Sequence, residues 1–152
     1  MYLPSVVLLC FVIPTLVPYY LFGESFLIAY FVCALFRYAS VLNATWLVNS
    51  LAHLWGSKPY DIRINPVENA LVAFFALGEG FHNYHHTFPQ DYATAEFGWV
   101  LNASTAFIDF FAMIGWAYDR KSIPKPFVEA RKNRTGPNSP LGAKQTKNTK
   151  VM

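Results

Sequence analysis

Three of the four histidines lie in one short segment, residues 78–92, whose sequence is GEGFHNYHHTFPQDY. On a helix, His82 shares a face with His85 and with His86, because residues three and four apart are neighbours on the helix surface. His85 and His86 themselves point about 100° apart. Neutral imidazole is a common ligand for iron, zinc or copper. The spacing therefore predicts a metal site, in which the adjacent histidines bind two metals or two sides of one site. A hydrogen-bonded cluster that holds no metal is the alternative.

The fourth histidine, His53, lies near the end of a long apolar segment, residues 26–55. A helix of roughly thirty residues is about 45 Å long, well beyond the ~30 Å hydrocarbon core of a bilayer. Its last turns would leave the lipid, where Asn49 and His53 would share one face at i, i+4 spacing. We expect all four histidines on the same side of the membrane. Four imidazoles could complete a tetrahedral zinc site, or form half of a larger site that holds two irons.

The distribution of charge indicates a membrane protein. The chain is 54% hydrophobic and 18% aromatic, and residues 1–54 contain only Glu24 and Arg37 as charged residues. Nine of the twelve lysines and arginines lie from Arg120 onward. The net charge of +3 is therefore no evidence for a nucleic-acid partner. We expect the basic tail to be solvated or to touch anionic lipid headgroups.

Residues 3–21 are apolar over about the length that crosses a bilayer, and residues 22–25 form a short turn before the second apolar helix. Pro14 and Pro18 are expected to kink or end the first helix. Residues 1–55 thus form two antiparallel transmembrane helices, the second extending into the cytosol, since Lys58 and Arg63 follow it directly. Arg37 would lie near mid-membrane, where it either has a functional role or pairs with a helix outside this chain.

Residues 56–122 are predicted to form a cytosolic, metal-binding helical cap. Asn65 as N-cap and Pro66 at the first position predict a helix over residues 66–77, too short to span. Residues 99–118 are long enough to span, but we interpret them as a cytosolic helix packed on the metal domain. Residues 123–152 read as a basic, largely disordered tail. The predicted fold class is an all-α membrane protein with two transmembrane helices and a cytosolic helical cap carrying the histidine box.

Two long motifs resemble one known family. GEGFHNYHHTFP is similar to the third histidine box of the membrane-bound acyl-CoA Δ9 desaturases, the stearoyl-CoA desaturase family, and NATWLVNSLAHLWGSKPYD (residues 43–61) is similar to the segment before that box. AYDRK (residues 117–121) and RTG (residues 134–136) resemble the family's C-terminal region. The family has two earlier boxes, HxxxxH and HxxHH, whereas this chain has no histidine before His53. We therefore expect it to be the C-terminal half of a desaturase.

The resemblance implies a di-iron centre with His53, His82, His85 and His86 among its ligands and Asn49 bound through water. It further implies that Thr45 and Trp46 line the acyl tunnel, although Trp46 by itself would be interpreted as an interfacial anchor. The implied reaction inserts a cis double bond, at the Δ9 position, into a saturated acyl-CoA with O2 and electrons from cytochrome b5. The implied location is the endoplasmic reticulum membrane, multi-pass, with a cytosolic C-terminus.

Part of the ligand set is absent from this chain, so we do not expect it to assemble the di-iron centre alone. Three interpretations follow: part of a desaturase, a short non-catalytic membrane protein that binds or regulates a full-length desaturase, or a four-histidine zinc protein.

Overall fold

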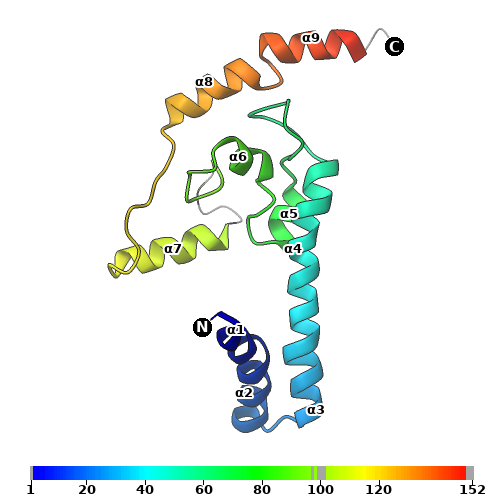
Figure 1. Ribbon diagram of the computed structural model, residues 1–152, viewed down its shortest axis with the longest axis vertical. Helices are drawn as coiled ribbons and strands as arrows, with labels where there is room; N and C mark the ends of the chain where they lie inside the picture. Colours follow the sequence, from blue (N-terminus) through cyan, green and yellow to red (C-terminus); the bar gives the residue numbers. More distant parts are fainter. Residues whose placement is uncertain (1, 97, 99–101, 150–152) are drawn as a thin grey trace. The chain divides into compact units, whose positions relative to one another are not determined.

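The computed structural model describes residues 2–96, 98 and 102–149, and all regular elements among them are helices (Figure 1). The chain forms two compact units, residues 1–45 and 46–152. Each unit is described by itself below.

Two continuous helices begin the chain, as the sequence predicts. The first covers residues 2–22 and consists of α1 (Tyr2–Val7), the π-helical segment η1 (Leu8–Val12) and α2 (Ile13–Phe22). The second covers residues 26–54 and consists of α3 (Phe26–Ile28), the π-helical segment η2 (Ala29–Phe36) and α4 (Arg37–Leu54). Both are long and apolar enough to cross a membrane. Gly23, with φ of 70°, makes the left-handed turn that ends the first helix, and the Ser25 hydroxyl caps the second.

Inside the first unit the two helices contact each other through small residues. Thr15, Ala29 and Ala34 are at most 5% exposed, while most large apolar side chains face outward. Small residues let helix backbones approach closely in lipid, where apolar burial alone does not drive association. This arrangement is that of a membrane protein.

Pro14 and Pro18 do not end the first helix, and a hydrogen bond from Arg37 is part of the reason. Pro14 has no N–H to donate to the carbonyl of Cys10, four residues earlier. The Arg37 guanidinium donates to that carbonyl at 2.7 Å and to the Cys33 carbonyl at 3.0 Å. The helix is π-helical just before Pro14, a local adjustment that relieves the missing bond. Arg37 thus has its partner within this chain and does not need a helix from outside it.

Arg37→Leu is expected to destabilise the first unit by about 1–2 kcal/mol, because the Cys10 carbonyl loses its donor. In a Pro14→Ala background the alanine N–H can bond Cys10, so the same Arg37→Leu change should cost less. Thermal unfolding of the four proteins of this double-mutant cycle in detergent measures the coupling. An equal cost of Arg37→Leu in both backgrounds would show that Pro14 and Arg37 are not coupled.

Among its described residues, the second unit contains the end of α4 and five further helices. They are α5 (Ala70–Phe75), α6 (His82–Thr87), α7 (Ala103–Met113), α8 (Lys125–Thr135) and α9 (Pro140–Thr149). Two small apolar clusters lie inside it, one of Val48, Ala52 and Val72 and the other of Tyr60, Tyr84 and Val128. Because these apolar clusters are small, hydrogen bonds and ion pairs also hold the second unit together.

The helix start at Asn65 is wrong. α5 begins at Ala70, and its N-cap is Asn69, whose side chain accepts from the Val72 N–H at 3.0 Å. No helix begins at Asn65-Pro66, because Glu68 is extended and its backbone groups bond to neighbouring segments. In a helix the same backbone groups would bond within the helix instead.

The ambiguous stretch at residues 99–118 contains α7. Its eleven described residues span about 17 Å, too short to cross a bilayer. α7 is bound to the second unit: the Ala103 N–H donates to the Leu77 carbonyl, the Asn102 side chain donates to the Ala93 carbonyl, and Tyr92 donates to Asp109. Residues 99–101 lie outside the described residues.

Residues 123–152 differ from the disordered tail that their composition predicts, since α8 and α9 occupy most of them. Val128 and Thr135 on α8 are at most 2% exposed. The Thr135 hydroxyl donates to the Tyr60 carbonyl at 2.8 Å, and Arg131 pairs with the buried Asp61 at 2.8 Å. These few contacts hold α8 on the rest of the second unit, although α8 contains few large apolar residues.

Candidate metal centre

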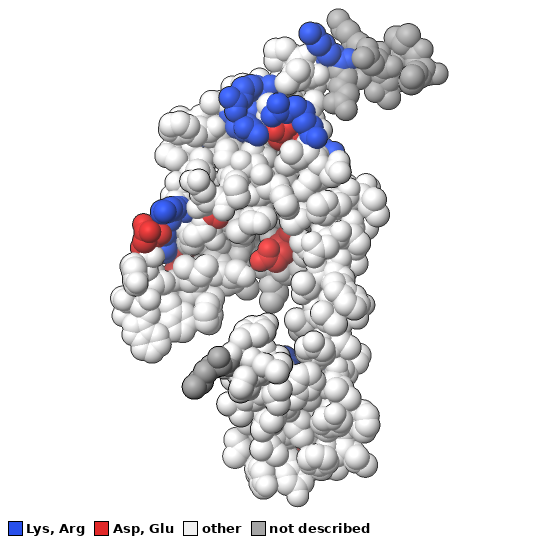
Figure 2. All heavy atoms as spheres, viewed as in Figure 1, with Lys and Arg blue, Asp and Glu red and all other residues white. Residues whose placement is uncertain are grey.

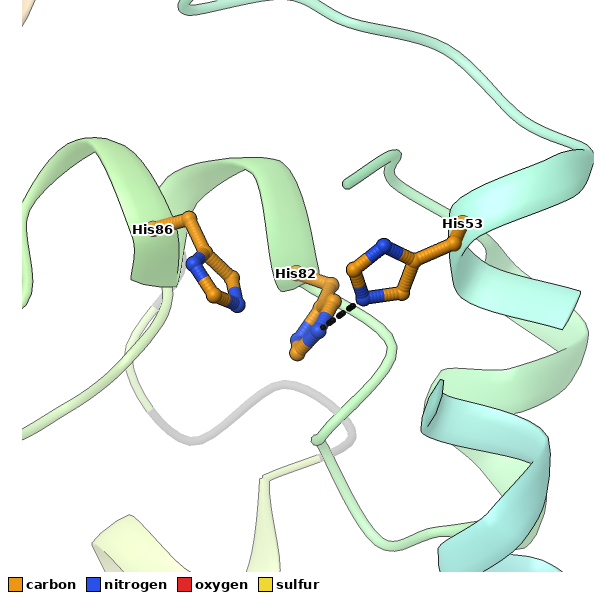
Figure 3. Close-up of side chains that lie close together, drawn as sticks. All are labelled: His53, His82 and His86. Atoms are coloured by element: carbon orange, nitrogen blue, oxygen red, sulfur yellow. Dashed lines mark hydrogen bonds between the residues drawn. The ribbon is translucent and has the colours of Figure 1, made fainter. Parts of the chain in front are cut away.

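His53, His82 and His86 converge in the second unit (Figure 3). Their ligand atoms all lie within 4.8 Å of one another, and Nε2 of His53 and Nε2 of His82 are 2.9 Å apart. His53 comes from the last turn of α4, and the other two come from α6. The two sequence motifs therefore meet, as their predicted placement requires.

His85 lies beside this group but is not one of the three histidines whose ligand atoms all lie within 4.8 Å of one another. Its ring centroid is 6.0 Å from that of His82 and 5.4 Å from that of His86. Its Nδ1 is buried and has no hydrogen-bond partner among the residues that the structure describes. Three imidazoles thus form one group, and the fourth lies next to it.

The three converging imidazoles fit a metal ion. Nitrogen ligands 2.0–2.1 Å from a tetrahedral ion lie about 3.4 Å apart, so small side-chain rotations would bring the cluster into range. The buried Nδ1 of His82 has no hydrogen-bond partner among the described residues. An unpaired buried nitrogen costs free energy, and a bound metal ion would remove that cost. Burial, followed by the neighbouring imidazoles, lowers the pKa of His82 to about 4, and burial lowers the pKa of His86. Both rings are therefore neutral at pH 7, the form that binds metals.

Asn83, between the ligand positions, fastens α6 from behind. The residue is 0% exposed and its carboxamide makes four hydrogen bonds. Its Oδ1 accepts from the N–H groups of Tyr60 and Asp61, at 3.0 and 3.2 Å, and its Nδ2 donates to the carbonyls of Asp61 and Pro66, at 3.0 and 2.9 Å. A carboxamide has two donors and two lone pairs, so this one is fully used.

Glu68 joins the segment that follows α4 to the segment that precedes α6. Its N–H and C=O pair with Ser57 at 2.7 and 3.0 Å, and it forms a second antiparallel bridge with Phe81. Its carboxylate accepts from the Tyr84 N–H at 2.7 Å. That N–H belongs to the first turn of α6, whose own N-cap Phe81 offers no side-chain acceptor. Glu68 thus links both histidine-bearing elements.

Two glycines permit this close approach. A Cβ at Gly56, where φ is 152°, would overlap the Glu68 carbonyl. A Cβ at Gly80 would overlap the backbone of Ala73 and Asn69. Gly80 therefore permits the close approach of the segment before α6 to the start of α5.

Burial raises the pKa of Glu68 from its usual 4.5 to about 7. Folding therefore favours the protonated carboxyl, and its contribution to stability is full below pH 4.5 and is lost as the pH rises through 7. We expect Glu68→Gln, which keeps an acceptor oxygen, to remove up to about 3 kcal/mol of this pH dependence. Urea unfolding of both proteins between pH 5 and pH 8 measures it. If the difference between the two proteins does not change with pH, the burial of Glu68 has no such consequence.

Comparison with known proteins identifies the family. The chain is 60% identical over 139 residues to an acyl-CoA desaturase of Cyprinus carpio, which covers 91% of the chain and 42% of the relative. It is 59% identical over 138 residues to a stearoyl-CoA desaturase of Capra hircus, covering 91% and 38%, and 58% identical over 135 residues to stearoyl-CoA desaturase 5 of Homo sapiens, covering 89% and 41%. No protein-family model matches the chain.

Over about nine tenths of its length, the chain is homologous to acyl-CoA desaturases. It spans about two fifths of the length of these curated relatives. Of the three histidines in the segment that resembles the desaturase box, His82 and His86 converge with His53.

The other predicted site residues lie on α4. Asn49 is exposed, one turn before His53. The Thr45 hydroxyl donates to the Val41 carbonyl at 3.0 Å. Trp46 is 58% exposed. Their roles in binding the metal and the substrate stay predictions.

Sequence reasoning missed Asn83, Glu68 and Asp61, which hold the histidine-bearing segments together. Asn83 lies between ligand positions, and a polar residue inside a short, buried helix signals a buried hydrogen-bond network. No comparable signal exists for Glu68, whose partners become neighbours only in the fold.

Proposed function

We propose that this chain is part of an acyl-CoA desaturase that inserts a cis double bond, at the Δ9 position, into a saturated acyl-CoA. The observation that carries the proposal is the convergence of His53 from α4 with His82 and His86 from α6. The printed names of the relatives, acyl-CoA and stearoyl-CoA desaturases, support the substrate class.

In this proposal His53, His82 and His86 hold one iron, and His85 is directed to a second. The two irons, when bound, supply the oxidising power needed to remove hydrogen from an unactivated methylene. The four imidazoles are too few for two irons, so further ligands must come from other histidine boxes of the kind the family has. Asn49, on the same face of α4 as His53, would bind through water.

The substrate's acyl chain requires positioning, because all its methylenes are chemically alike. Thr45 and Trp46, one to two turns before His53, would line a narrow apolar tunnel that places one carbon pair near the centre. We propose cytochrome b5 as the electron donor and the endoplasmic reticulum as the membrane, with the second unit on the cytosolic side.

The absence of His85 from the three-histidine group supports this proposal over a single tetrahedral zinc site that uses all four imidazoles. A non-catalytic partner of a full-length desaturase stays as the second candidate, because its surface would carry the same motifs.

The test isolates the native polypeptide with an antibody raised against α9 and incubates it with radiolabelled stearoyl-CoA and palmitoyl-CoA, O2, NADH, cytochrome b5 and its reductase. A cis-monounsaturated product and two irons per polypeptide support the proposal. An iron-free polypeptide that yields no product and co-purifies with an active desaturase would support the non-catalytic candidate. Zinc at one per polypeptide would support a zinc protein.

A further inference from the structure

α7 exposes a row of large apolar side chains. Phe107, Phe110 and Met113 are 65%, 52% and 75% exposed. The row continues beyond the helix with Trp116 and Tyr118, at 74% and 86%. Soluble proteins rarely expose so many large apolar groups together, and such patches usually mark a binding surface.

The polar side of the same helix faces inward. Asn102 and Thr105 are each 2% exposed, and both bond to the Ala93 carbonyl. The Asp109 side chain is 15% exposed and accepts from Tyr92 and Arg120. A helix on a water-soluble surface has the opposite arrangement, apolar inside and polar outside. These inward bonds fix the rotation of α7 so that its apolar side stays outside.

α5 adds to this apolar surface. Leu71, Phe74 and Phe75 are between 53% and 61% exposed, and Leu77, just after the helix, is 62% exposed. The bond from the Ala103 N–H to the Leu77 carbonyl joins the end of α5 to the start of α7. Residues 70–78 contain no charged residue. We call the exposed side chains of these two helices and of Leu77, Trp116 and Tyr118 the α5–α7 face.

The residues that follow the α5–α7 face are those of a membrane interface. Asp119, Arg120 and Lys121 follow Tyr118, and the two basic side chains pair with Asp109 and Asp119. Figure 2 shows the surface around α7 mostly in white, with charged atoms near its C-terminal end and a further acidic patch toward the centre of the view. Tryptophan and tyrosine favour the headgroup level of a bilayer, and nearby lysine and arginine bind anionic headgroups.

The second unit is also tethered to the membrane. It begins at Trp46, inside the continuous helix of residues 26–54 that is long and apolar enough to cross a bilayer. A unit so tethered meets lipid at high local concentration. We propose that the α5–α7 face lies in the headgroup–acyl boundary of the bilayer, so that the unit carrying the histidines rests on lipid. Such a contact resembles that of an interfacial amphipathic helix. The proposal does not depend on the metal or on the reaction.

The test uses the full chain, with Cys10→Ala and Cys33→Ala, in vesicles of phosphatidylcholine and phosphatidylserine. An environment-sensitive fluorophore is attached at Phe110→Cys, or at Asn133→Cys on the exposed side of α8 as a matched control. We expect blue-shifted emission and strong quenching by spin-labelled lipids at position 110, and quenching by aqueous iodide at position 133. Because both labels sit on the same unit, a folding defect would alter both.

Two results would overturn the proposal. A label at position 110 that is quenched by iodide and not by spin-labelled lipids faces water. A label protected from both quenchers is covered by protein, either a second copy of the chain or another polypeptide, and dilution of the chain in the vesicles separates these two.

Discussion

Asn83→Ala is expected to lower the free energy of unfolding of the second unit by about 3–5 kcal/mol, since four buried backbone groups lose their partner together. The orphaned groups are the N–H groups of Tyr60 and Asp61 and the carbonyls of Asp61 and Pro66. Leaving one buried polar group unpaired costs about 1–3 kcal/mol, and water entering the gap left by the carboxamide would recover part of the total. The histidines on either side of Asn83 should lose their common orientation as well.

The measurement is chemical unfolding in detergent followed by intrinsic fluorescence. Asn133→Ala is the matched control, because Asn133 is exposed on α8, and its removal should change stability by less than about 0.5 kcal/mol. Similar costs for the two variants would mean that the carboxamide of Asn83 does not organise the site.

Asp61→Ala is expected to cost about 2–4 kcal/mol, because it leaves two arginines without their shared carboxylate. Asp61 is 1% exposed and pairs with Arg63 and Arg131, both at 2.8 Å. Nε of Arg131 is already buried without a partner, so the guanidinium cannot easily find another. The loss should release α8 from the rest of the unit, which limited proteolysis between α7 and α8 would detect.

Asp119→Ala is the control for this change, since Asp119 is 75% exposed and lies 3.9 Å from an equally exposed Lys121. Such a surface pair contributes about 0–1 kcal/mol. Proteolysis that is equally fast in both variants would contradict the role of Asp61.

The Asp61 carboxylate also makes the stability of the second unit sensitive to acid. Hydrogen bonds from Arg63 hold the pKa of Asp61 at about 2, below its usual 3.8. Its contribution to stability is therefore complete above pH 3.8 and is lost as the pH falls through 2. Wild-type protein should lose stability faster than Asp61→Ala across this window.

The sequence predicted the elements whose signals are local. The length and composition of the two apolar helices, and the HxxHH spacing on α6, are properties of neighbouring residues. The meeting of His53 with His82 and His86 followed from placing both motifs on one side of the membrane. Their resemblance to the desaturase box pointed to the same residues.

Signals that depend on contacts distant in sequence were missed. Asn65-Pro66 has good helix-start chemistry, but Glu68 is held extended by Ser57 and Phe81, so the helix begins later. The sequence of α8 resembles a solvated basic segment, because few of its residues hold it on the unit. Those residues bond to Tyr60 and Asp61, some seventy residues away in the sequence. The partner of Arg37 could not be predicted, because it is the Cys10 carbonyl, which Pro14 leaves without a helical donor.

We expect His53, His82 and His86 to form one metal site and His85 to belong to another. Cobalt binding to the full chain in detergent distinguishes the two sites, because Co²⁺ reports its nitrogen ligands in the visible spectrum. His82→Ala and His85→Ala are compared with wild type under anaerobic titration. Wild type and His85→Ala are expected each to bind one Co²⁺ with the same spectrum, whereas His82→Ala loses it. Equal loss in both variants would show instead that the four histidines act as one site.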